Sequence, residues 1–320
     1  MEALMPDESY NGTWEREGRS LNAAALAGLL GVGIIYFYGG GLMASLSVFL
    51  ARRGASFDGE AEGFFDHLIR MEELTKNPIR VCVTLSQFLL MLGPTLWLIR
   101  RWHTLNVRAY IRLKPCSPVQ IALAFCTVVF LFPANHDLSG FFVDKLNIPE
   151  ELLRVNEVLV RSSGLWEFFF VIFVIAVTPA ICEEVLFRGY AQRTFERTMG
   201  WKSVVLVGFL FGLYHMQPLG LISLSGLGWV FGYFYYASRS LLPGMVAHFT
   251  NNFAAVLMVH IAERQRLAGN PSTLHIPPAL TVAGLLLAAA AIYGFYRVSA
   301  SSSHDPLPAE GQAGNTSGVP

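Results

Sequence analysis

The chain of 320 residues is too apolar for an ordinary soluble domain, since 53% of its residues are hydrophobic and only 14% are charged, against about 25% charged in soluble domains. Its 23 basic residues balance its 23 acidic ones, so no excess of positive charge marks a nucleic-acid-binding face. The four cysteines form no CxxC pair, which argues against a zinc ribbon or a disulfide scaffold. We therefore expect membrane lipid as a partner and no nucleic acid.

Long stretches without charge predict membrane passes. The first three lie between Arg19 and Arg52, Arg80 and Arg100, and Lys114 and Asp137. Each approaches or exceeds the ~20 residues that cross a bilayer as a helix. The stretch from Lys202 to Arg239 is too long for one pass, and Gln217 to Gly220 supplies a turn. We expect about eight passes, over residues 21–50, 81–99, 119–132, 165–186, 204–215, 219–236, 245–261 and 278–296.

These passes predict an all-α fold, a polytopic membrane helical bundle over residues 21–298. A polar segment, 1–20, precedes it, and it does not fit a cleavable signal peptide because the apolar run that follows exceeds a signal core of ~7–15 residues. Residues 138–163 are typical of an amphipathic helix. The tail, 299–320, has almost no core-forming residues, so we expect it to be disordered.

The loops predict the orientation of the bundle. With eight passes, 13 basic residues lie on the side of both termini and 10 on the other side. Because Lys and Arg are enriched in cytoplasmic loops, this bias favours both termini in the cytoplasm.

Ionisable side chains at bilayer depth are costly, and the first cluster of them ends the fourth pass. Glu184 and Arg188 are four residues apart and lie on one helix face, where they can neutralise each other. Glu183 is rotated by about 100° from Glu184, so Arg188 cannot easily serve both. A carboxylate left without a cation in apolar surroundings can accept and return protons near neutrality. The structural alternative is an ion-pair cluster at a helix end.

The second cluster is in the fifth pass. Gly208 and Gly212 form a small-xxx-small face that lets another helix approach closely. His215 follows three residues later and lies more than halfway across the core, about a dozen residues after Lys202. A lone intramembrane histidine also occurs as a hydrogen-bonded packing residue, so its role depends on its partners.

The third cluster is near the start of the seventh pass, after a Pro-Gly helix start. His248 and Asn252 are four residues apart, so an imidazole and an amide project from one face and can hold a developing oxyanion. The alternative role for this pair is interhelical hydrogen bonding. We expect that lesser role for Asn251.

The three clusters can face one cavity, because the fourth pass ends on the side where the fifth and seventh begin. Pro179 lies one turn before Glu183 and frees a backbone carbonyl, which favours a bend that admits water. A carboxylate, a nearby histidine and a separate pair of donors meet the requirements for activating water and stabilising a tetrahedral intermediate.

Together the motifs EExxxR (Glu183, Glu184, Arg188), FxxxH (Phe211, His215) and HxxxN (His248, Asn252) resemble those of the CPBP family. This family comprises the CAAX protease and bacteriocin-processing membrane enzymes, also called the ABI family, and includes the Rce1-type prenyl-protein endopeptidases. The resemblance covers about residues 165–257, and the FRGY and LLPGMVAH contexts are similar to bacterial members.

The resemblance implies an eight-helix intramembrane protease in a bacterial cytoplasmic membrane, with its site open to the cytoplasmic side. Glu183 would activate water with help from His215, and His248 and Asn252 would form the oxyanion site. Glu184 and Arg188 would support them. The family has been described both as metal-dependent and as glutamate-type, and Glu183, His215 and His248 could also supply three zinc ligands. Against zinc, the HExxH motif is absent.

The leading hypothesis from the sequence is hydrolysis of a peptide bond in a membrane-associated protein or peptide. One alternative is a non-proteolytic immunity, maturation or scaffolding protein that uses the polar cavity to bind a partner. A proton-coupled transporter is disfavoured, because no second half of the chain repeats the pattern.

Overall fold

The computed structural model describes residues 10–52, 64–145, 159–217, 220–268 and 276–302. Within these ranges the chain forms helices and no strand, which confirms the all-α fold class. The α-helices and the π-helical segments (η) are α1 (Thr13–Arg16), α2 (Leu21–Arg52), α3 (Phe64–Ser86), η1 (Gln87–Leu92), α4 (Gly93–Leu98), η2 (Ile99–His103), α5 (Val107–Tyr110), α6 (Pro118–Lys145), α8 (Leu165–Ile172), η3 (Phe173–Val177), α9 (Thr178–Glu184), η4 (Val185–Gln192), α10 (Arg193–Met199), α11 (Lys202–Tyr214), α12 (Leu221–Ser238), α13 (Leu242–Leu267) and α14 (Pro278–Ser302).

Six helical stretches of the described chain are long and apolar enough to cross a membrane, which confirms a polytopic bundle. They are Leu21–Leu50, Leu74–His103, Pro118–Phe141, Leu165–Met199, Leu242–Leu267 and Pro278–Ser301. The other two expected passes correspond to α11 and α12, of 13 and 18 residues. At ~1.5 Å per residue α11 extends about 20 Å, so it ends inside a bilayer core of ~30 Å.

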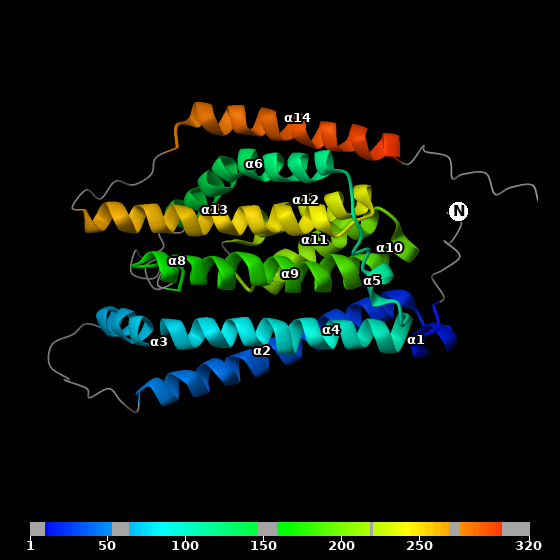
Figure 1. The fold of residues 1–320 in the computed structure, drawn as a ribbon, viewed down its shortest axis with the longest axis horizontal. Coiled ribbons are helices and arrows are strands. Elements are labelled where there is room, and N and C mark those ends of the chain that lie inside the picture. Colours follow the sequence, from blue (N-terminus) through cyan, green and yellow to red (C-terminus); the bar gives the residue numbers. More distant parts are fainter. Residues whose placement is uncertain (1–9, 53–63, 146–158, 218–219, 269–275, 303–320) are drawn as a thin grey trace, which may run out of the picture.

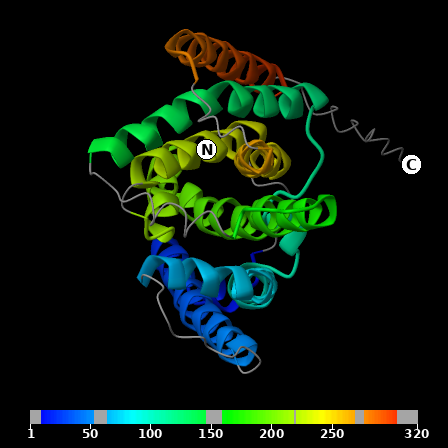
Figure 2. The same cartoon turned by 90° about the vertical axis from the view of Figure 1, so that its left-hand side faces the viewer.

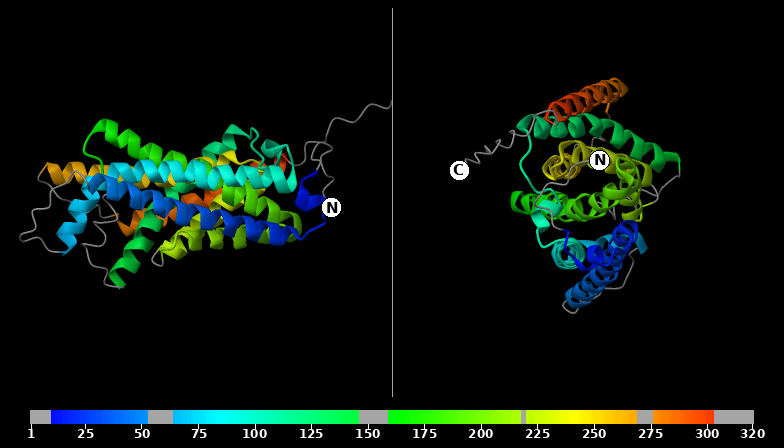
Figure 3. Two further views of the ribbon diagram at one scale, coloured as in Figure 1. Left: turned by 90° about the horizontal axis from the view of Figure 1, so that it is seen from below. Right: turned by 90° about the vertical axis from the view of Figure 1, so that its right-hand side faces the viewer.

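The long helices lie alongside one another in layers (Figures 1 and 2). α14 covers α6, α6 packs on α13, and α13 packs on α9. On its other side α9 contacts η1, which lies against α2, and Figure 3 shows α2 beside α3 and α4. The start of α2 and the end of α14 lie at the same end of the molecule (Figure 1), as an even number of passes requires. The segment that carries the paired glutamates, α9, therefore lies in the middle of the bundle.

The third pass is longer than the sequence pattern predicts. α6 continues through Pro133 to Lys145, although polar residues follow the expected end near residue 132. Asp137 is accommodated because the hydroxyl of Thr281, on α14, donates a hydrogen bond to its carboxylate at 2.6 Å. The first part of the amphipathic segment expected over 138–163 therefore continues α6. Residues 146–158 lie outside the described residues, as do the turn residues 218–219 and the tail from 303 onward.

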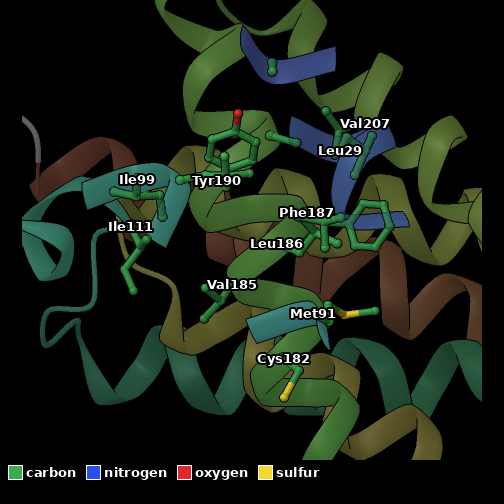
Figure 4. Packing of buried hydrophobic residues seen from close by; sticks show 14 of the residues in the cluster. Leu29, Met91, Ile99, Ile111, Cys182, Val185, Leu186, Phe187, Tyr190 and Val207 are labelled. Atoms are coloured by element: carbon green, nitrogen blue, oxygen red, sulfur yellow. The ribbon is translucent and has the colours of Figure 1, made fainter. Parts of the chain in front are cut away.

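A continuous core surrounds η4. Phe187 and Tyr190 are fully buried and belong to one cluster with Leu29 of α2 and Met91 of η1 (Figure 4). Gly28 permits this close approach of α2, because a Cβ there would lie 2.1 Å from the hydroxyl oxygen of Tyr190. The first two passes thus pack directly on the helix that follows the paired glutamates.

The small-residue face predicted on α11 is confirmed. A Cβ at Gly208 would lie 2.1 Å from Cδ1 of Trp229, and a Cβ at Gly212 would lie 2.3 Å from Oγ of Ser225. Both neighbours are on α12, so the glycines let α11 and α12 pack with their backbones close together. This contact fixes the end of α11, where His215 is the C-terminal cap.

The short helix α1 ties the N-terminal segment to the bundle. The N–H of Gly12 donates to the carbonyl of His103 at 2.8 Å. The carboxylate of Glu15 accepts a hydrogen bond from His103 Nδ1 at 2.7 Å and pairs with Arg197 of α10. One carboxylate therefore connects the end of the second pass with the end of the fourth.

Candidate active site

The paired glutamates lie at the end of α9, between two π-helical segments. η3 precedes Thr178 and Pro179, and η4 begins directly after Glu184. π-helical turns inside α-helices are frequent at functional sites, because the extra residue in the turn changes which side chains face a neighbouring helix. Here they lie on both sides of the two glutamates, in the middle of the bundle.

Glu184 is paired through one of its two oxygens inside the bundle, while its Oε2 is buried without a hydrogen-bond partner among the described residues. Its Oε1 accepts hydrogen bonds from Arg188 Nη1 at 2.9 Å and from His248 Nδ1 at 2.8 Å. Arg188 also donates through Nη2 to the carbonyl of Gly228 at 3.0 Å, and both Glu184 and Arg188 are 0% exposed. The ion pair predicted from the i, i+4 spacing therefore forms, and His248 joins it.

Glu183 has no guanidinium partner in the part of the chain that the structure describes. There its Oε2 is buried without a hydrogen-bond partner and lies 3.9 Å from Nε2 of His215 and 3.9 Å from Nε2 of His248. These distances are too long for direct hydrogen bonds but fit a bridging water. Two imidazoles from α11 and α13 thus converge on one carboxylate oxygen from α9.

The ring orientation of both histidines follows from their other nitrogens. His215 Nδ1 is 2.8 Å from the carbonyl oxygen of Phe211, which can only accept, so Nδ1 carries the hydrogen. His248 Nδ1 donates in the same way to the carboxylate of Glu184. In each neutral imidazole the nitrogen toward Glu183 is therefore an acceptor, and it becomes a donor when the ring is protonated.

Aromatic rings enclose these polar groups. The Phe211 ring lies against both imidazoles, with centroid distances of 4.7 Å to His215 and 5.7 Å to His248. It also lies 4.6 Å from the guanidinium carbon of Arg188, and Phe231 stacks on His248 at 5.2 Å. The first residue of the FxxxH motif is thus a wall of the site. Apolar walls strengthen electrostatic interactions within it.

Asn252 lies one turn beyond His248 on α13, and its amide is directed at the backbone of the fourth pass. Its Nδ2 donates to the carbonyl of Ile175 at 2.9 Å, and its Oδ1 accepts from Asn251 at 3.1 Å. Ile175 is four residues before Pro179, which has no N–H, so this is the carbonyl that the proline deprives of its α-helical donor. One amide hydrogen of Asn252 holds α9 in place, and the second is left for another acceptor.

One polar residue beside Glu183 was not among those selected from the sequence. Gln87 Nε2 donates to Oε1 of Glu183 at 3.4 Å, across 96 positions of sequence. A single amide in the charge-free stretch between Arg80 and Arg100 is the signal that could have indicated it.

Glu183, His215 and His248 do not fit the zinc site that the resemblance left open. Among the residues that the structure describes, no group of three His, Cys, Asp or Glu side chains could hold a metal ion. Zinc bonds of ~2.0–2.1 Å in tetrahedral geometry would bring the ligand atoms about 3.4 Å apart, whereas the carboxylate oxygen is 3.9 Å from each imidazole nitrogen. We therefore assign no step to a metal.

Comparison with known proteins bears on the same helices. Residues 165–254 match the family model described as "Rce1-like: Type II CAAX prenyl endopeptidase Rce1-like", which confirms over this segment the family predicted from the three motifs. No curated protein and no solved structure matches the chain. The family match indicates a membrane protease, and the matched segment contains every residue of the three motifs.

Proposed function

We propose that the protein is an intramembrane endopeptidase that hydrolyses a peptide bond of a membrane-associated protein or peptide. The observation that carries the proposal is the unequal pairing of two adjacent glutamates. Glu184 accepts hydrogen bonds from a guanidinium and an imidazole, whereas Glu183, within the described residues, accepts one from a neutral amide and directs Oε2 toward two imidazole nitrogens. A buried carboxylate in that setting can take a proton from water and return it.

In the proposed reaction a water molecule binds between Glu183 and His215. Glu183 Oε2 takes one proton, and the lone pair of His215 Nε2 accepts the other hydrogen of the water in a hydrogen bond. The water oxygen then forms a bond to the peptide carbonyl carbon, and the carbonyl electrons move to its oxygen. When the C–N bond breaks, Glu183 returns its proton to the leaving nitrogen. The products are a carboxylic acid and an amine, and Glu183 is a carboxylate again.

In this proposal His248 and Asn252 stabilise the oxyanion. Because His248 Nδ1 donates to Glu184, its Nε2 can donate to an oxyanion only when the ring is protonated. In the resting site the Glu184 carboxylate also accepts a hydrogen bond from Arg188. Asn252 contributes its second amide hydrogen, while the first stays on Ile175. Removing one such donor costs about 10²–10³ in kcat in other hydrolases.

The proposal includes a bacterial cytoplasmic membrane, with the site open to the cytoplasm. The bias of 13 basic residues against 10 supports this orientation, and the contexts FRGY and LLPGMVAH, which resemble bacterial members of the family, support the bacterial membrane. Labelling one cysteine introduced in the loop between Arg101 and Lys114, in a variant whose four native cysteines are replaced by serine, tests the orientation. A membrane-impermeant maleimide should react in inside-out vesicles and not in right-side-out vesicles, and the reverse result would overturn the orientation.

The activity is tested with the purified protein in liposomes and a peptide library derived from a bacterial proteome, with new termini identified by mass spectrometry. The library includes farnesylated peptides with CAAX ends and their unmodified counterparts, so that a preference for prenylated substrates is measured directly. The peptide that the wild type cleaves with the highest kcat/KM becomes the reporter peptide.

Matched variants give the decisive comparison. Glu183→Gln and His215→Ala should abolish cleavage of the reporter peptide. Glu263→Gln and His260→Ala are the matched controls, because they change the same residue types on α13. Glu263 contacts Arg266 and His260 contacts Ser162, and both variants should cleave normally. If folded Glu183→Gln protein cleaves like the wild type, the proposed chemistry is wrong. If the wild type cleaves nothing and Glu183→Gln keeps its biological activity, the chain is a binding or scaffolding protein.

A further inference from the structure

We propose that Gln87, in the second pass, is a positioning residue that fixes the orientation of the Glu183 carboxylate. The inference rests on the proposed function, because it concerns the base of that reaction. Gln87 lies outside the segment 165–254 that matches the family model, and it belongs to none of the three motifs.

The hydrogen bond from Gln87 binds one oxygen of the Glu183 carboxylate and does not involve the other. Its Nε2 donates to Oε1 of Glu183 at 3.4 Å, and this is the hydrogen bond that the carboxylate receives within the described residues. Oε2, the oxygen without a hydrogen-bond partner, is the one that faces His215 and His248. The amide thus holds one oxygen so that the other points toward both imidazoles.

An amide is suited to this task. It has hydrogens to donate and no charge, so it can orient a carboxylate without neutralising it as Arg188 neutralises Glu184. The reverse orientation of the amide would place its oxygen against the carboxylate, with two acceptors facing each other. Nε2 toward Glu183 is therefore the arrangement that the chemistry requires.

The backbone around Gln87 supports a fixed position. Gln87 is the first residue of the π-helical segment η1 and is 4% exposed. The phenol of Tyr36, on α2, interacts with the side chains of Gln87 and Ser86. Gly33 lies one turn before Tyr36, and a Cβ there would lie 3.0 Å from the ring of Tyr214, which follows the end of the small-residue face on α11. The first two passes thus complete a wall of the site.

Among the residues that the structure describes, Gln87 Oε1 has no hydrogen-bond partner, although it is buried. If this side chain served only for packing, Met or Leu would give a more stable fold, because an unsatisfied buried polar atom is destabilising. An amide at this position is therefore explained by its polar contacts, the bond to Glu183 and the interaction with the phenol of Tyr36.

The test compares Gln87→Met, Gln87→Glu and a matched control with wild type on the reporter peptide. Gln87→Met keeps the shape and loses the donor, so kcat should fall on the order of 10- to 100-fold while KM stays within about twofold, as expected for a misaligned catalytic group. Gln87→Glu keeps the shape and faces Glu183 with a second carboxyl group, so kcat should fall further. Gln120→Met removes another buried amide, which donates to Ser299, and should leave kcat unchanged.

Thermal unfolding of each variant separates positioning from folding. A fall in kcat with unchanged KM in Gln87→Met, at a melting temperature no lower than that of Gln120→Met, supports the inference. Unchanged kcat in folded Gln87→Met overturns it. A rise in KM at constant kcat also overturns it, because Gln87 would then contact substrate. In both cases the proposed function stands if Glu183→Gln is inactive, and it fails separately if Glu183→Gln cleaves.

Discussion

The hydrogen bond between Asn252 and the Ile175 carbonyl allows a test of how the helix that carries Glu183 is held. Pro179 has no N–H for that carbonyl, and Asn252 Nδ2 donates to it at 2.9 Å. Asn252→Ala removes this donor, whereas Pro179→Ala adds one, the backbone N–H of residue 179. Because both changes act on one acceptor, their effects on the free energy of unfolding should not add.

The expected magnitude follows from the geometry. Hydrogen bonds between membrane helices average about 0.6 kcal/mol, with a maximum near 1.7 kcal/mol, and a buried carbonyl left without a donor costs about 1–3 kcal/mol. We therefore expect Asn252→Ala to lower the free energy of unfolding by about 1–2 kcal/mol. In the Pro179→Ala background the same change should cost about 1 kcal/mol less, since the backbone then supplies the donor.

The assay is unfolding in mixed micelles by titration with sodium dodecyl sulfate, for the wild type, both single variants and the double variant. Thr250→Val is the control on the same helix, because the Thr250 hydroxyl donates to the Val246 carbonyl of α13 itself. Its effect should add to that of Pro179→Ala. Additive effects of Asn252→Ala and Pro179→Ala would refute the shared acceptor.

Cleavage by the double variant bears on the second amide hydrogen of Asn252. We expect cleavage to stay low even where stability is restored, because the donor assigned to the oxyanion is also missing. Full recovery of cleavage in the double variant would show that Asn252 acts only through Ile175.

Three further predictions concern the metal, the buried ion pair and the N-terminal helix. Cleavage should be unchanged after dialysis against EDTA, because the carboxylate oxygen is 3.9 Å from each imidazole nitrogen; a loss that zinc restores would contradict this. Arg188→Met should destabilise the protein by about 3–5 kcal/mol, because it leaves the buried Glu184 without its guanidinium. Adding Glu184→Gln should recover most of that loss. An equal loss in the single and the double variant would argue against a stabilising ion pair between Glu184 and Arg188. Burial raises the pKa of Glu15, but hydrogen bonds from His103 and Arg197 outweigh it and hold the pKa below its ordinary value of 4.5. The stabilisation from Glu15 is therefore complete above pH 4.5 and is lost as the pH falls below that value. The difference in melting temperature between wild type and Glu15→Gln should accordingly narrow in acid, and a difference independent of pH would refute the assignment.

Local spacing predicted much of the site because its ion pair is formed within one helix. Glu184 and Arg188 are neighbours on any α-helix, so their pairing needs no knowledge of the fold. The passes were predictable for a similar reason, since charge is excluded from the bilayer core wherever no partner is available. α6 shows the limit of that rule. The partner of Asp137 is Thr281, 144 positions away, and nothing near Asp137 in the sequence indicates that the helix continues through it.

The contacts of the site that the sequence did not predict connect different helices. Gln87 reaches Glu183 because η1 packs on α9, and Asn252 reaches Ile175 because α13 packs on η3. The HxxxN spacing places His248 and Asn252 on one face, but it does not say that one amide hydrogen of Asn252 is already used on a carbonyl freed by a proline. Such assignments depend on which helices are adjacent and on which of their residues lie at the same level along the helix axes.

The different surroundings of the two glutamates have one geometric cause. Neighbouring residues of a helix point about 100° apart. Glu184 therefore faces Arg188 and Nδ1 of His248, whereas Glu183 faces Nε2 of His215 and Nε2 of His248. His248 is shared: its Nδ1 is on Glu184 and its Nε2 is toward Glu183. If His248 Nε2 binds the oxyanion, as proposed, the ring stays bonded to Glu184 through Nδ1 without movement of either side chain. In the proposed reaction, the carboxylate that does no chemistry thus orients the imidazole that stabilises the charge which the other carboxylate helps to create.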